Sequence, residues 1–172
     1  MKMAWDINIV DIKELQTPDR LSICDFSVAL EKAFSYPNDF FIIEWNGIGL
    51  KMPFSYCLSD VLEDVLDIIE ELMKAEMGEY YTGFSPNEVF DCDWKLDWNG
   101  DRLEISADWR QGPLPVAELV EHCSKCIVSK KHFLMSWKML FEYCVEKLSE
   151  ISFDYESNEQ SLRINRIIST MN

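Results

Sequence analysis

The sequence lacks any long hydrophobic run. A representative apolar stretch is Phe40-Phe41-Ile42-Ile43, whereas a membrane-spanning helix needs roughly 18 such residues. The first residues, from Met1 to Asp6, contain no apolar segment of the kind that a signal peptide requires. We therefore expect a cytoplasmic protein that does not contact a membrane.

Glycine and histidine are also scarce. The chain has 6 glycines and only 2 histidines, His122 and His132. A glycine-rich phosphate loop is not indicated, because Gly47 and Gly49 belong to a predicted hairpin. Neither histidine lies in a motif typical of serine or cysteine hydrolases. We expect no catalytic activity and no cofactor.

Basic residues are outnumbered by acidic ones. With 16 Lys and Arg against 31 Asp and Glu, the formal net charge is −15. Such a field repels nucleic-acid phosphates and anionic lipids, so direct binding to either is disfavoured. It attracts a basic protein partner instead. The alternative is that the charge serves solubility alone.

The negative charge is concentrated in less than a third of the chain. Between Asp60 and Asp108 there are fifteen acidic residues, opposed only by Lys74, Lys95 and Arg102. This segment therefore carries twelve of the fifteen excess negative charges. A lopsided distribution favours a binding surface over a uniformly solvated one.

The six cysteines do not indicate a disulfide framework. They are scattered over a chain long enough to form its own core, so we expect reduced thiols. Cys123 and Cys126, together with His122 or His132, have the chemistry of zinc ligands. A structural zinc site usually needs two close ligand pairs, and the second pair is missing here. We expect no metal, although the sequence leaves occasional binding open.

A length of 172 residues predicts a single domain, 1–172. Hydrophobic periodicity predicts a strand over Trp5–Ile12 and helices over Phe26–Phe34, Ser59–Glu76 and Lys130–Glu150. Asp60 and Glu63 resemble a capping box, and Gly78 a helix stop. Val116–His122 suits either a short helix or a strand, and Ile151–Ile168 a final pair of strands.

Two Trp-Asn-Gly sequences predict hairpins, since Asn-Gly suits the positive φ angles of a type I′ turn. A turn at Asn46-Gly47 pairs Trp45 with Ile48, Ile43 with Leu50 and Phe41 with Met52. A turn at Asn99-Gly100 pairs Leu96 with Leu103, Trp94 with Ile105 and Cys92 with Ala107 on the inner face. It also sets Asp97 opposite Arg102 and Lys95 opposite Glu104 on the outer face.

The predicted fold class is α+β, with an antiparallel sheet built on these two Asn-Gly hairpins and helices packed on one face. A hairpin followed by a helix occurs twice, at about 40–76 and 92–150. This pattern indicates either a degenerate duplication or the chance recurrence of a good turn.

Two further groups of residues have functional potential. Asp91, Asp93 and Asp97, with Glu88, would suit a magnesium ion in a metal-dependent hydrolase. Because Asp97 is predicted to lie opposite Arg102, the carboxylates left for the ion are Asp91, Asp93 and Asp108. No base or oxyanion donor accompanies them, which is more typical of a solvated sheet face. Trp98 and Trp109 lie near hairpin ends, where we expect them to be half exposed. A tryptophan beside carboxylates is typical of a contact for a cationic partner.

A small acidic chain without catalytic motifs, with its negative charge gathered on one helix and one hairpin, resembles the immunity proteins of bacterial polymorphic-toxin systems such as contact-dependent growth inhibition. The resemblance implies a protein that binds its cognate toxin domain, often a basic nuclease, and covers the active site. The alternatives are an acidic nucleic-acid mimic that inhibits a DNA- or RNA-binding protein, and the carboxylate hydrolase. The sequence leaves the oligomeric state open.

The candidate partner-binding residues are the acids and tryptophans of that helix and hairpin. They are Glu63, Asp64, Asp67, Glu70, Glu71, Asp91, Asp93, Trp98, Asp101, Asp108 and Trp109.

Overall fold

The computed structural model describes residues 4–10, 12, 14–17, 25–84, 89, 91–151 and 158–171. Cys24, Glu88 and residues 152–157 of the predicted final strand pair lie outside these ranges. The described residues form an α+β fold with two antiparallel sheets, of three and four strands. The prediction of one sheet is therefore wrong in its detail, although the fold class is confirmed.

The three-stranded sheet has the order β1-β2-β3. Its strands are β1 (Trp5–Ile9), β2 (Phe40–Trp45) and β3 (Ile48–Pro53). Trp45 pairs with Ile48, Ile43 with Leu50 and Phe41 with Met52, which is the predicted register. Asn46 and Gly47 both have positive φ, at 51° and 85°, as a type I′ turn requires.

The four-stranded sheet has the order β4-β5-β6-β7. Its strands are β4 (Met77–Gly83), β5 (Asp91–Asn99), β6 (Arg102–Gln111) and β7 (Lys125–Ser129). The turn between β5 and β6 is Gly100-Asp101 rather than Asn99-Gly100, because Asn99 still pairs with Arg102. Gly100 has a positive φ of 57°.

This displacement of the turn makes the predicted β5–β6 register wrong by two residues. Leu96 pairs with Ile105 and Trp98 with Leu103, while Asp97 faces Glu104 and Lys95 faces Ser106. The two predicted charge pairs are therefore absent from this ladder. Because side chains alternate with a period of two, a shift of two residues leaves each one on its predicted face.

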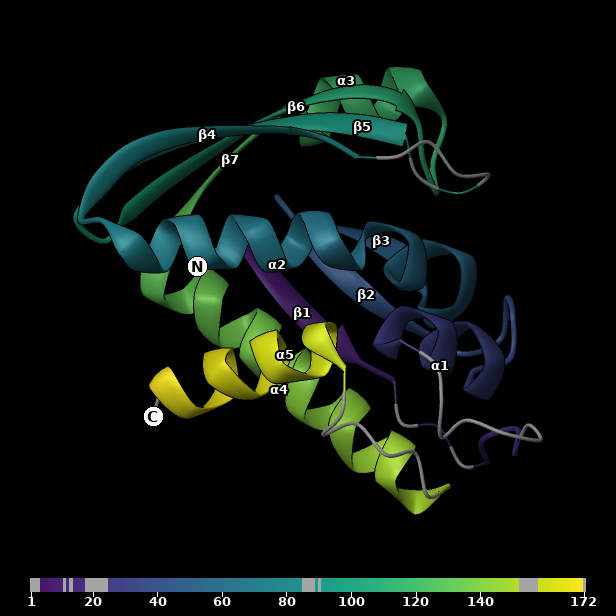
Figure 1. The fold of residues 1–172 in the computed structure, drawn as a ribbon. Coiled ribbons are helices and arrows are strands. Elements are labelled where there is room, and N and C mark those ends of the chain that lie inside the picture. Colours follow the sequence, from purple (N-terminus) through teal and green to yellow (C-terminus); the bar gives the residue numbers. More distant parts are fainter. Residues whose placement is uncertain are drawn as a thin grey trace.

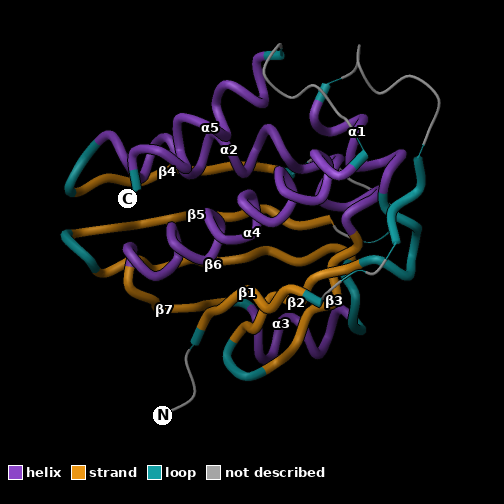
Figure 2. The backbone as a smooth tube through the Cα atoms, turned by 90° about the horizontal axis from the view of Figure 1, so that it is seen from below, coloured by secondary structure: helices purple, strands orange, loops and turns teal. Residues whose placement is uncertain are grey.

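The two sheets adjoin along β7 and β1, and their strands follow one another across the molecule (Figure 2). The Cys126 thiol donates a hydrogen bond to the carbonyl of Ala4, at 3.1 Å. The side-chain amide of Asn46 donates to the carbonyls of His122, at 2.9 Å, and Lys125, at 2.7 Å. The two bonds from Asn46 join the β2–β3 turn to the end of helix α3 (Val116–Cys123) and the start of β7.

Four helices lie on one side of the strands (Figures 1 and 2). They are α1 (Phe26–Ala33), α2 (Ser59–Lys74), α4 (Lys130–Glu150) and α5 (Glu159–Thr170). An irregular turn, Phe54–Leu58, leads from β3 into α2, so Asp60 is not the N-cap and the predicted capping box is wrong. The fifth described helix, α3 (Val116–Cys123), lies apart from α2 and packs against β6.

The described part of the predicted final strand pair is helix α5, so that prediction is wrong. The Asn158 side chain accepts a hydrogen bond from the amide of Ser161 at 2.9 Å and caps the helix. Ile164 and Ile167, three residues apart, are buried. The duplication stays a prediction: α3 and β7 intervene between the second hairpin and α4, with no counterpart after the first.

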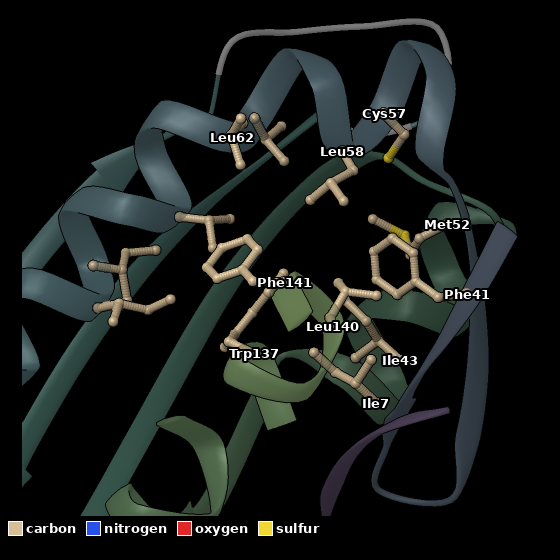
Figure 3. Close-up of a cluster of buried hydrophobic side chains, with 14 of the residues drawn as sticks. Ile7, Phe41, Ile43, Met52, Cys57, Leu58, Leu62, Trp137, Leu140 and Phe141 are labelled. Atoms are coloured by element: carbon tan, nitrogen blue, oxygen red, sulfur yellow. The ribbon is translucent and has the colours of Figure 1, made fainter. Parts of the chain in front are cut away.

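A continuous hydrophobic core joins the helices to the sheets. Phe41, Ile43 and Met52 of the small sheet point toward side chains of α2 and α4 (Figure 3). On the α4 side these are Trp137, Leu140 and Phe141, and on the α2 side Leu58 and Leu62. All of them are buried.

Candidate functional site

The acidic residues of α2 are mostly engaged within the protein. Arg163 of α5 donates hydrogen bonds to Glu63 at 2.6 Å, to Asp67 at 2.5 Å and to Glu70 at 2.9 Å. Its side chain is only 15% exposed. Burial opposes the charge of Arg163, but its hydrogen bonds to Glu70 and Asp67 raise its pKa above the ordinary value. One cation therefore binds three of the predicted partner-binding residues.

The other two predicted acids of α2 also have neighbours. Asp64 accepts a hydrogen bond from the Thr82 hydroxyl of β4 at 3.4 Å. Glu71 pairs with Lys74, one turn further along the helix, at 2.5 Å. The acidic face of α2 thus packs against α5 on one side and β4 on the other.

Replacing Arg163 with leucine is expected to lower the free energy of unfolding by about 2 kcal/mol. The change leaves three neighbouring carboxylates without their shared cation, and α5 loses its polar anchor to α2. Urea unfolding followed by circular dichroism measures the loss. Arg163→Lys should lose less, because it keeps the charge but not the planar fork. Equal stability of the leucine variant and the wild type would contradict this role.

The predicted acids of β5 form a second ion-pair cluster, on the outer face of the large sheet. Arg110 donates to Asp91 at 2.7 Å and to both oxygens of Asp93 at 2.7 and 2.9 Å. The Tyr81 hydroxyl donates to Asp93 at 2.7 Å. These bonds from Arg110 and Tyr81 lower the pKa of Asp93. Asp108 faces Asp93 across the strand pair and is exposed.

Asp101 has a structural contact at the start of α4. Its carboxylate accepts hydrogen bonds from the Lys131 amide at 2.8 Å and the Ser129 hydroxyl at 2.7 Å. The bond from the Lys131 amide, followed by that from Ser129, lowers the pKa of Asp101. Asp101 therefore satisfies an amide of the first helical turn that would otherwise lack a partner.

Asp101→Ala is expected to destabilise the protein by about 1 kcal/mol at neutral pH, the usual cost of losing a helix cap. Folding lowers the pKa of Asp101, so its carboxylate contributes fully to the free energy of unfolding above the unfolded pKa of about 3.9. That contribution is lost as the pH falls through the lower pKa of the folded state. Urea unfolding at pH 7 and pH 3 should show that the variant and the wild type differ less in free energy of unfolding at pH 3. An equal difference at both pH values would show that the charge of Asp101 does not stabilise the fold.

The prediction that Trp98 and Trp109 are half exposed is wrong. Their exposed fractions are 4% and 3%, and their indole N–H groups donate to the carbonyls of Ala75 at 3.1 Å and Cys123 at 2.9 Å. Both lie on the inner face of the large sheet. Neither is accessible to a partner in this structure.

Strands β7 and β4 were not predicted from the sequence, and β4 is the outermost strand of the large sheet. Met77 and Tyr81 on this strand are 64% and 63% exposed, more than any other large hydrophobic side chain among the described residues. Its sequence carries a signal, because Tyr80, Tyr81 and Thr82 are residue types that favour strands. Gly78, predicted to be a helix stop, lies inside β4, and α2 already ends at Lys74.

Acidic side chains lie along both sides of β4. On the outer side, Glu79 and Asp97 are exposed and lie directly opposite each other. Glu76, the residue before the strand, is also exposed. On the inner side, Tyr80 faces α2: partial burial and the charges of Asp67, Glu71 and Asp64 raise its pKa. We call this surface the acidic edge. It comprises β4, Glu76 and Asp97 with Asp64, Asp67 and Glu71 of α2.

Basic residues pair with three acids of the acidic edge. Lys95 lies 3.4 Å from Glu79, Lys74 pairs with Glu71 and Arg163 with Asp67. A shallow cavity of about 400 Å³ follows the strand and is lined by Glu79, Tyr80, Tyr81 and Lys95. The acidic edge thus combines exposed aromatic surface, a hollow and a surrounding negative field.

The remaining outer face of the large sheet has mixed charge. Glu104 pairs with Arg102, at 2.7 Å, and with Lys125, and Arg110 holds Asp91 and Asp93. A phosphate backbone presents a regular row of negative charges without interleaved cations. The alternation of acids and bases across β5, β6 and β7 does not have that pattern.

The cysteine and histidine residues do not assemble a metal site within the described chain. No three His, Cys, Asp or Glu side chains among the described residues lie close enough to share an ion. Burial raises the pKa of Cys123 to about 11 and that of Cys126 to about 12. The His132 Nε2 atom lies 3.1 Å from the carbonyl of Trp5, and His122 is exposed beside Glu121.

No helix within the described ranges is long and apolar enough to cross a bilayer. Comparison of the chain with protein-family models, with curated proteins and with solved structures finds no match. The inference about function therefore rests on the residues and geometry of the acidic edge.

Proposed function

We propose that this chain is an immunity protein that binds a cognate, basic toxin domain and neutralises it by covering its active site. The observation that carries the proposal is the acidic edge, where Met77 and Tyr81 are exposed among acidic side chains. Exposed aromatic and methionine side chains are enriched in protein interfaces. The surrounding charge selects a cationic partner.

The proposed inhibition is steric and electrostatic, and the protein performs no chemistry of its own. A toxin that cleaves nucleic acid needs a basic cleft for phosphates, and carboxylates such as Glu79 and Asp97 would occupy that cleft in their place. The net charge of −15 would accelerate encounter. Close packing around Tyr81 would slow dissociation. We place this activity in the cytoplasm of the producing cell.

The acids that are paired with an arginine of the same chain are expected to have a different role from the other acids of the acidic edge. Three acids bound to Arg163, which are Glu63, Asp67 and Glu70, and Asp91, bound to Arg110, are expected to contribute to the long-range field rather than to contacts. Separating a carboxylate from its arginine on complex formation would cost binding energy. The acidic edge is therefore the expected centre of the interface.

Co-expression with the C-terminal domain encoded by the neighbouring upstream gene tests the proposal. We expect that domain alone to arrest growth, this chain to restore growth, and the two to elute as one complex in size-exclusion chromatography. A control chain with Trp45→Ala, expected to fold poorly, should give reduced protection. Absence of a complex between the two folded proteins would refute the proposal, as would a neighbouring gene with no toxic domain.

A further inference from the structure

We propose that the partner contributes a basic, extended segment that pairs with β4 as a fifth strand of the large sheet. The identity of the partner as a toxin rests on the proposed function, whereas the mode of binding rests on β4 itself. Three features of the described residues favour such a strand: the backbone of β4, the charges beside it, and the contrast between β4 and the edge strand β3.

The backbone of β4 has one row of hydrogen-bonding groups directed away from the sheet. The Gly100 amide donates to Glu76 and the Phe84 amide donates to Cys92, which fixes the alternation of the β4–β5 ladder. In an antiparallel pair every second residue bonds to the neighbouring strand. Gly78, Tyr80 and Thr82 therefore bond to β5. The amides and carbonyls of the alternate residues point to the open edge: Met77, Glu79, Tyr81 and Gly83.

The charges beside β4 favour a cationic strand. A strand added to this edge would lie about 4.8 Å from β4, with its side chains alternating between the two faces of the sheet. On the outer face they would lie beside Glu79, with Asp97 one strand further away. On the inner face they would approach Glu71 of α2, whereas Asp67 is already bound by Arg163. Lysine or arginine would meet a carboxylate on either face.

The same charges disfavour a second copy of this chain. Two β4 strands paired with each other would bring Glu79 of one copy toward the acidic residues of the other. Their α2 acids would also approach across the junction. Like charges at such short range are repulsive, and cross-strand pairs of like charge destabilise sheets. The field therefore selects a partner of opposite charge.

The other open edge is protected in a way that β4 is not. Strand β3 is the outer strand of the small sheet and contains Lys51, which lies over the Phe40 ring at 4.1 Å, and Pro53. Lysine and proline are the usual means of blocking an edge strand. Strand β4 contains neither. The molecule thus blocks one edge and leaves the other available for pairing.

A synthetic peptide of alternating lysine and threonine tests strand pairing without the toxin. The measurement is amide hydrogen exchange by NMR of the wild-type chain with and without the peptide. We expect slower exchange at the amides of Met77, Glu79, Tyr81 and Gly83, and no change at the β3 edge. The same peptide N-methylated at every amide keeps its charge but cannot pair, so it should bind about tenfold more weakly. A glutamate–threonine peptide should not bind.

Three outcomes would overturn the proposal. Equal binding of the N-methylated peptide would show attraction by charge alone. Unchanged exchange at the four amides would place the peptide elsewhere. Protection that grows with protein concentration in the absence of peptide would assign the edge to a second copy. The toxin experiment is separate: a toxin complex that leaves these amides unprotected would preserve the proposed function and refute strand pairing.

Discussion

Replacement of Trp45 by alanine is expected to lower the free energy of unfolding by about 4 kcal/mol. Trp45 has no exposed surface, and its ring lies 5.3 Å from that of Trp5, 5.6 Å from Trp94 and 6.1 Å from Trp109. Trp5 belongs to the small sheet, and Trp94 and Trp109 belong to the large one. Loss of this ring would leave a cavity where the sheets meet.

Urea denaturation followed by far-ultraviolet circular dichroism measures this effect without relying on tryptophan fluorescence. Met139→Ala is the control, because Met139 is 57% exposed on α4 and should change stability by less than about 0.5 kcal/mol. A loss below about 1.5 kcal/mol for the Trp45 variant would contradict the packing argument. Two separate transitions in the wild type would show that the sheets do not depend on one another.

Local patterns in the sequence predict β1, both hairpins, the faces of their strands and helices α1, α2 and α4, because those features depend on near neighbours. They do not predict β4, β7 or α5. The β2–β3 register follows from one turn with suitable residues, Asn46 and Gly47. The β5–β6 register does not, since either Asn99-Gly100 or Gly100-Asp101 can form a tight turn. In the structure the turn is Gly100-Asp101, and the Asp101 carboxylate accepts a hydrogen bond from the Lys131 amide of α4. Local patterns contain no information about this contact with a helix distant in sequence.

The candidate site depends more heavily on distant contacts. Arg163 neutralises Glu63 from a position 100 residues further along the chain, and no periodicity predicts that encounter. The same holds for Trp98, whose indole reaches the carbonyl of Ala75. Sequence counts show which part of the chain carries the excess negative charge. They do not distinguish an acid that faces a partner from one that anchors a helix.

Reversing three exposed acids of the acidic edge, Glu76, Glu79 and Asp97, to lysine should slow association with a basic toxin domain by at least about tenfold at low salt. All three are exposed, so the folded structure should tolerate the change. The deficit should shrink as salt is raised, because the Debye length falls to about 8 Å at physiological ionic strength. Stopped-flow measurements over a range of salt concentrations give the association rate constants and their dependence on salt.

The matched control reverses three exposed acids away from the acidic edge, Glu118 and Glu121 of α3 and Glu146 of α4. This variant has the same change in net charge, so any effect of total charge alone is equal in both. If the edge variant associates more slowly than the control, the position of the acids matters and the interface is centred on β4. If the two variants associate equally, only the overall field matters, and the acidic edge is not the binding surface.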